Sequence, residues 1–88
     1  MQKLSLWNGK ITRPHFNEES GARYFPVDIE NMIPLRIRNA DGSVHEDTDV
    51  EYYYLIFDNR TGMPIEGAPR FYDADVLEKA LEKLNGAD

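Results

Sequence analysis

The pattern of apolar and polar residues predicts two strands in the middle of the chain. Residues 50–57 carry β-branched and aromatic side chains in succession, so both faces of an extended segment would be apolar. We therefore expect this tyrosine-rich strand in the interior of a sheet. Residues 33–38 alternate strictly, with aliphatic side chains on one face and Pro34, Arg36 and Arg38 on the other. This pattern is typical of a half-buried strand with a solvent-exposed basic face. Pro34 is compatible with the start of a strand or with a sheet edge.

The N-terminal segment predicts a β-hairpin. Residues 3–7 alternate between polar and apolar, Asn8-Gly9 follows, and residues 10–12 would form the returning strand. Asn-Gly favours a two-residue type I′ turn because both of its positions require positive φ.

Turn-forming residues separate the remaining elements. Residues 13–32 contain two prolines, a glycine and a Glu-Glu-Ser run, which predicts a long loop with a short extended piece at residues 24–27. The Asn-Ala-Asp-Gly sequence at residues 39–42 predicts a turn and a short return through Val44. Residues 63–71 are expected to run beside the tyrosine-rich strand as an edge strand or irregular segment, because their two prolines lack the backbone N–H that would donate to a neighbouring strand.

The C-terminal segment predicts a helix that begins after Asp73, with Asp75 in the positive first turn and Gly86 just past the end. Because an isolated helix of this length is marginal in water, it should form by docking on the sheet. The chain is thus predicted to fold as one α+β domain over residues 1–88: a mostly antiparallel sheet of four or five strands with the C-terminal helix packed on one face. The apolar stripe that would face the sheet is Val76, Leu77, Ala80, Leu81 and Leu84.

Length and composition restrict the class of protein. The chain has 88 residues, 41% of them hydrophobic, and no cysteine, so disulfides and thiolate metal sites are excluded. The N-terminus lacks a long apolar segment, and no run approaches the roughly 20 apolar residues of a membrane-spanning helix. We therefore predict a cytoplasmic protein without a membrane partner.

Charge is distributed unevenly along the chain. Residues 1–44 carry six basic and five acidic side chains, whereas residues 45–88 carry four basic and eleven acidic ones, giving net charges of +1 and −7. A negative C-terminal half repels polyanions and attracts basic surfaces. Charge asymmetry is therefore the main functional signal in this sequence.

Motifs for catalysis and metal binding are weak. His15 and His45 are thirty residues apart, which favours surface or turn histidines over a zinc site. Residues 47, 49 and 51 alternate as the first ligands of a calcium loop do, but Tyr52 stands where that loop requires glycine and Asp58 where it requires glutamate. These carboxylates are instead expected in a solvated acidic turn. Because nucleophile motifs and phosphate loops are also missing, we predict a protein that is not an enzyme and uses no metal or cofactor.

These observations predict a non-catalytic protein-binding module whose acidic surface contacts a basic, nucleic-acid-handling protein. Small acidic chains of phages and other mobile elements often act in this way, as inhibitors or accessory factors. If the tyrosine-rich strand is uncovered, it also offers an apolar patch for a homodimer. The expected contact residues are Glu46, Asp47, Asp49, Glu51 and Tyr53.

Two alternatives remain open. Arg36 and Arg38, with Lys10 and Arg13 nearby, would form a small nucleic-acid-binding platform, although the acidic half makes nucleic acid the less favoured partner. A small enzyme subunit would need a site shared across a dimer, because so short a chain offers little volume for a closed cleft.

Overall fold

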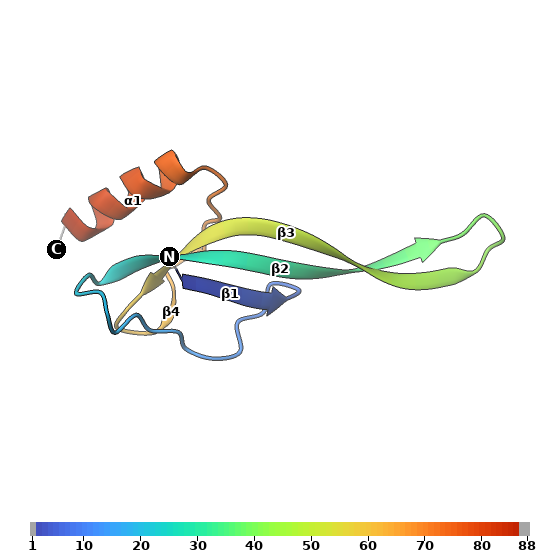
Figure 1. Ribbon diagram of the computed structural model, residues 1–88, viewed down its shortest axis with the longest axis horizontal. Coiled ribbons are helices and arrows are strands. Elements are labelled where there is room, and N and C mark those ends of the chain that lie inside the picture. The colour runs from blue at the N-terminus through green and yellow to red at the C-terminus, as the bar shows by residue number, and fades with distance from the viewer. Residues whose placement is uncertain (1, 87–88) are drawn as a thin grey trace.

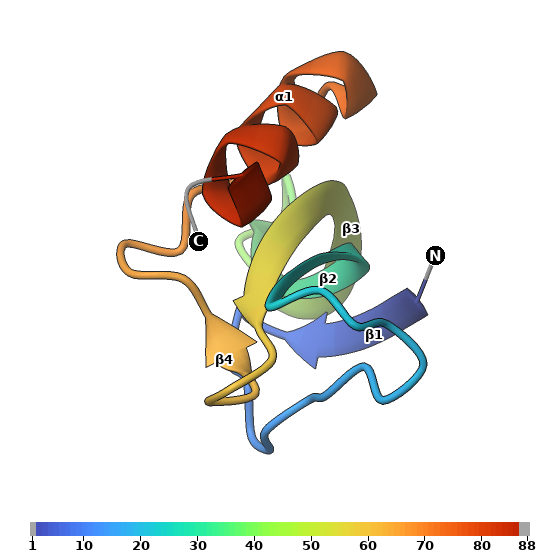
Figure 2. The same cartoon turned by 90° about the vertical axis from the view of Figure 1, so that its left-hand side faces the viewer.

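The computed structural model describes residues 2–86. Its four strands form one mixed sheet in the order β1-β2-β3-β4, in which β1 runs parallel to β2 and the other pairs are antiparallel. The single helix α1 lies across one face of the sheet, and the connection between β1 and β2 lies on the opposite side (Figures 1 and 2). The predicted α+β class is confirmed. The elements are β1 (Gln2–Trp7), β2 (Tyr24–Arg38), β3 (Val44–Asp58), β4 (Met63–Pro64) and α1 (Ala74–Gly86).

Strands β2 and β3 form a hairpin that is much longer than the rest of the sheet. Each contains 15 residues, whereas β1 pairs only with residues 27–32 of β2. Residues 33–50 therefore project as a two-stranded hairpin, which we call the arm, from the rest of the molecule, which we call the body (Figure 1). The molecule is 58 Å long.

The tip of the arm is a tight turn held by polar side chains. The Asn39 amide donates to the Ser43 carbonyl at 2.8 Å, and Gly42 supplies the positive φ of 88° that the turn requires. Asp41 Oδ1 accepts hydrogen bonds from the Ser43 hydroxyl at 2.6 Å and from the Ser43 amide at 2.9 Å. The Ser43 hydroxyl bond is the main reason that the pKa of the Asp41 carboxyl lies below its usual value.

The two long strands extend well beyond their predicted bounds. The short extended piece predicted at residues 24–27 belongs to β2, but residues 28–32 also belong to β2 instead of the predicted loop, and residues 45–49 belong to β3 instead of the predicted acidic turn. Fifteen cross-strand pairs override the local turn signals. Pro26 and Pro34 flank the part of β2 that pairs with β1, so neither proline removes a hydrogen bond from that ladder.

The N-terminal prediction is half right. Asn8 and Gly9 have φ values of 53° and 71°, as the predicted turn requires, but the hairpin is reduced to one bridge between Trp7 and Lys10. The predicted returning strand at residues 10–12 is absent from the described structure. β1 instead pairs with β2 and contributes the buried side chain of Leu6 to the core.

One face of the sheet is buried beneath the β1–β2 connection. Phe25 and Phe57 are 2% and 0% exposed there, and the His15 ring packs on both, with centroid distances of 6.2 and 5.8 Å. His15 is thus partly buried in a loop against the core, which corrects the expectation of a surface histidine, whereas His45 is exposed on the arm. The rest of this cluster is Leu6, Val27, Ile29, Tyr53 and Leu55.

The helix covers the other face of the body. Asp73 caps it as predicted, because its Oδ1 accepts from the Asp75 amide at 2.8 Å and its carbonyl from the Leu77 amide at 3.0 Å. Leu77 is fully buried. At the other end, Asn85 Oδ1 accepts from the Tyr24 amide at 3.1 Å, and its Nδ2 donates to the Tyr24 carbonyl. In the predicted stripe Ala80, Leu81 and Leu84 are half-buried, but Val76 is exposed.

The segment between β3 and α1 agrees with its prediction. β4 contains only two residues, and a single bridge between Tyr54 and Phe71 adds one more contact to β3. The segment is therefore irregular and leaves most of the outer edge of β3 uncovered.

Candidate functional site

The arm is the part of the structure that the rest of the chain covers least. Every side chain from residue 34 to residue 50 is exposed, so the expected half-burial of residues 33–38 holds for Ile33 and is wrong for residues 34–38. Trp7 at the end of β1 lies beside the base of the arm, where it lines a hollow with residues 34–36 and 46–48, and the helix and the β1–β2 connection do not extend over the arm (Figure 1). Isolated two-stranded hairpins are marginal in water, and contiguous exposed apolar side chains mark interaction surfaces. The large exposed aliphatic side chains of the arm are 36–46% exposed: Leu35, Ile37, Val44 and Val50.

Cross-strand pairing sorts the side chains of the arm onto two faces. Residues opposite one another in the ladder share a face, so the aliphatic side chains of β2 lie beside Asp49, Asp47 and His45 of β3. One row of this face is thus apolar, and the neighbouring row carries two carboxylates. We call it the acidic-aliphatic face; it consists of Ile33, Leu35, Ile37, His45, Asp47 and Asp49.

The opposite face of the arm carries both of its arginines. Arg36 lies opposite Glu46, and Arg38 lies opposite Val44. We call residues 34, 36, 38, 44, 46 and 48 the arginine face. Lys10 and Arg13, which the nucleic-acid hypothesis grouped with these arginines, line a hollow beside β1 instead of the arm.

The predicted contact residues on the arm are divided between its faces. Asp47 and Asp49 belong to the acidic-aliphatic face, whereas Glu46 belongs to the arginine face. Among residues 2–86 neither aspartate forms an ion pair. Glu46 faces Arg36 across the ladder, so its charge is partly balanced.

The other two predicted contact residues lie in the body. Glu51 Oε1 accepts from Arg70 Nη1 at 2.6 Å, and the Arg70 guanidinium lies 4.5 Å from the ring centroid of Tyr53. Tyr53 is 3% exposed, so the expectation that it contacts a partner at the surface is not met. Its burial raises the pKa of the phenol. The neighbouring Tyr52, at 64% exposed, is the tyrosine of this strand that faces solvent.

Negative charge is therefore not pooled over the whole C-terminal half. Glu51 is paired with Arg70, and Asp58 with Arg23 at 3.3 Å. The Arg60 amide, assisted by Arg23, lowers the pKa of the Asp58 carboxyl. The remaining acidic side chains among the described residues are divided between the arm, the start and exposed face of α1, and Glu66 in the segment after β4.

Backbone pairing shows which amides of the arm face outward. The Asn39 amide donates to the Ser43 carbonyl across the hairpin. Because the pattern repeats every second residue, the backbone N–H and C=O groups of odd-numbered arm residues pair across the hairpin, and those of even-numbered residues point to the open edges. At Pro34, which has no backbone N–H, the outer edge of β2 therefore lacks one hydrogen-bond donor. Proline at this position weakens the edge as a template for another strand.

Two aspartates protect the outer edge of β3. Asp47 Oδ1 accepts from the Thr48 amide at 2.8 Å, and Asp49 Oδ1 accepts from the Val50 amide at 2.9 Å. Both amides face outward, so the aspartates satisfy donors that an added strand would otherwise pair with. Sequence reasoning missed this role, although the Asp-Thr-Asp-Val alternation was a signal for it. Both edges of the arm are thus protected against pairing with another strand, whereas its two faces are available for contacts.

Removing this edge protection should cause self-association. The triple variant P34V, D47T and D49T restores an outward donor on β2 and frees two on β3, so we expect its average mass in light scattering to rise with protein concentration. The double variant E78Q and E82Q removes the same negative charge from the helix and should keep the native mass. A triple variant that matches the native mass at every concentration would show that the edges are not protected in this way.

The described residues contain no group of three or more histidine, aspartate or glutamate side chains placed to hold a metal ion. In the same part of the chain no helix has the length and apolar character needed to cross a membrane. No protein-family model, curated protein or solved structure matches the chain.

Proposed function

We propose that this protein is a non-catalytic binding module that engages a basic protein through the acidic-aliphatic face of its arm. The proposal is carried by one observation: an aliphatic row, in which Leu35 and Ile37 are exposed and Ile33 is half-buried, runs beside two carboxylates that form no ion pair among residues 2–86. Such a module would act in the cytoplasm as an inhibitor or accessory factor. By occupying a basic surface, it would keep nucleic acid away from that surface.

The chemistry of the face defines its partner. The aliphatic row spans four residue steps, or about 14 Å. It therefore fits a partner that presents apolar side chains flanked by lysine or arginine. Burial of the apolar row would supply affinity, and the carboxylates would steer the encounter and select the partner. A second copy of the chain fits this face poorly, because each copy brings two carboxylates and no lysine or arginine to the contact.

Charge reversal on the arm tests the proposal. Protein captured from lysate at low salt by the native chain should be released at high salt. The same protein should be lost with the D47K and D49K double variant, because attraction becomes repulsion. The E78K and E82K variant makes the same change in net charge on the helix and should retain it. Equal capture by both variants, or no capture by the native chain at low salt, would refute the proposal.

The arginine face supports a second candidate function, nucleic-acid binding. A two-stranded ribbon can enter the major groove of DNA, and Arg36 and Arg38 lie on one exposed face of such a ribbon. Glu46 opposite Arg36 and the net charge of −6 oppose it. A mobility shift with single- or double-stranded probes that disappears in the R36A and R38A variant would favour this function over protein binding.

A further inference from the structure

Strand β1 has an open edge without the protection found on the arm. It is the first strand in the sheet order, its only strand partner among the described residues is β2, and on its outer edge only Trp7 is occupied, by a bridge to Lys10. The Asn8 amide donates to the Met32 carbonyl at 2.7 Å, so even-numbered residues of β1 face β2, and Lys3 and Ser5 turn their backbone groups outward. Among the described residues, no proline interrupts β1 and no side chain accepts from the amides of Lys3 or Ser5.

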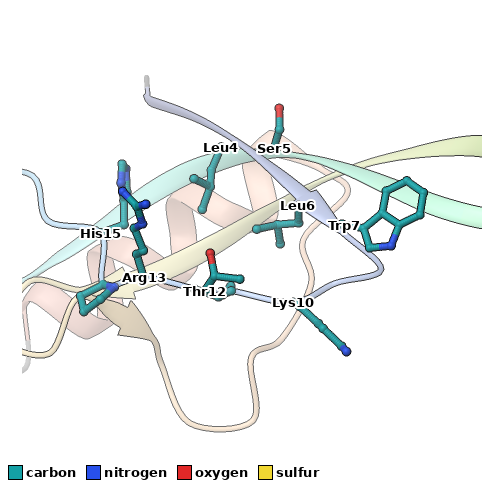
Figure 3. Close-up of a pocket in the computed structure, with 10 residues that line it drawn as sticks. Leu4, Ser5, Leu6, Trp7, Lys10, Thr12, Arg13 and His15 are labelled. Carbon is teal, nitrogen blue, oxygen red and sulfur yellow. The ribbon is translucent and has the colours of Figure 1, made fainter.

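A hollow of about 450 Å³ lies beside this edge. Leu4 and Leu6 point from β1 toward the loop that carries Thr12 and Arg13, which forms the opposite wall (Figure 3). Ile11 adds a further apolar side chain to the lining. An open strand edge beside an apolar hollow is the arrangement in which an extended peptide adds to a sheet and places alternate side chains in pockets.

The charge around the hollow is positive. Lys10 and Arg13 line it, no carboxylate does, and Lys3 is exposed on β1 itself. None of these three side chains forms an ion pair within residues 2–86. A lysine in the middle of an edge strand discourages pairing with neutral or basic strands, whereas a carboxylate on the added strand turns it into an attractive contact.

We propose that the β1 edge binds an extended acidic segment of another protein by strand addition. The backbone of that segment would pair with Lys3 and Ser5, and its apolar side chains would enter the hollow. Its carboxylates would lie on the opposite face of the added strand and meet Lys3, while Lys10 and Arg13 attract the acidic segment toward the edge. The acidic strand β3 of a second copy is a poor occupant, because Asp47 and Asp49 already bond to its outward amides. This site is separate from the arm and does not depend on the function proposed for it.

A pair of synthetic peptides tests this site. One fluorescein-labelled seven-residue peptide alternates glutamate with valine and leucine, and the second has lysine in place of glutamate. In fluorescence anisotropy at low salt we expect the glutamate peptide to bind at least tenfold more tightly. The K3E variant should weaken its binding about fivefold, which corresponds to one partly exposed charge contact. The K79E variant makes the same change in net charge on the helix and should bind as the native chain does.

Strand addition also has a backbone signature. Ser5→Pro removes an outward amide and should weaken the glutamate peptide about tenfold, whereas Ser5→Ala should leave its affinity unchanged. In the native chain, hydrogen exchange at the amides of Lys3 and Ser5 should slow when the peptide is added, which tests the site even if the proline variant does not fold. Equal affinity for both peptides, or unchanged exchange at these two amides with the peptide in excess, would overturn the proposal.

Discussion

Replacing Leu77 with alanine should destabilise the protein by about 2–5 kcal/mol, the usual cost of truncating a buried leucine. Leu77 is 1% exposed and is the one fully buried side chain that α1 contributes within the described residues. Native domains are stable by only about 5–15 kcal/mol, and a chain this short should lie at the low end of that range. Urea unfolding followed by circular dichroism should therefore show a much lower midpoint, or a chain that is largely unfolded in buffer.

Val76 provides a matched control on the same helix. It precedes Leu77 in the chain but is 54% exposed, so Val76→Ala should change the free energy of unfolding by no more than about 0.5 kcal/mol. If the two substitutions had equal effects, α1 would not be docked through Leu77, and the helix-covered face of the sheet would be open to solvent.

Replacing Gly62 with alanine should cost about 2–4 kcal/mol, because strain in the backbone and steric overlap act together. Gly62 has a φ of 73°, which an L side chain rarely adopts. A Cβ at this position would lie 2.7 Å from Pro14 Cβ and 2.8 Å from Phe16 Cζ. The Gly62 carbonyl also accepts from the His15 amide at 2.7 Å, so moving this backbone would disturb the loop that covers the core.

Gly67 separates the two causes. Its φ of 80° is similar, but a Cβ there would meet no atom within 4 Å. Gly67→Ala should therefore cost only the backbone strain, about 1–2 kcal/mol. The difference between the two variants in thermal or urea unfolding measures the overlap with the β1–β2 connection. An equal loss at both positions would mean that this connection does not pack against Gly62.

Several elements could be predicted from the sequence because their signals are local. The turn at Asn8 and Gly9 follows from the φ values that these residues tolerate, and the start of α1 follows from the capping carboxylate of Asp73. The succession of β-branched and aromatic residues at 50–57 correctly predicted a strand with two apolar faces, and the alternation of residues 33–38 correctly assigned side chains to opposite faces of β2. These features depend on neighbours a few positions away, and the tertiary structure left them unchanged.

The candidate site was only partly predictable. The acidic run on β3 was recognised, but its division between two faces depends on the register with β2, which pairs Asp47 with Leu35 and Glu46 with Arg36. The hydrogen bonds that Asp47 and Asp49 accept from the following amides protect the sheet edge only because those amides point to an open edge, and this too depends on the register. Burial of Tyr53 was not predictable either, because both faces of its strand are equally apolar in sequence.

By itself, the sequence of this protein determined the class of fold, the helix, the tight turns and the alternation of side chains along the long strands. Only the tertiary structure decided that β1 pairs in parallel, that residues 28–32 belong to β2, and that residues 33–50 leave the body as an arm. The physical reason is that the alternation of residue types along a strand predicts which side chains share a face, but it does not predict whether another layer covers that face. Coverage depends on contacts between segments far apart in the chain, and in this protein those contacts end where β1 ends.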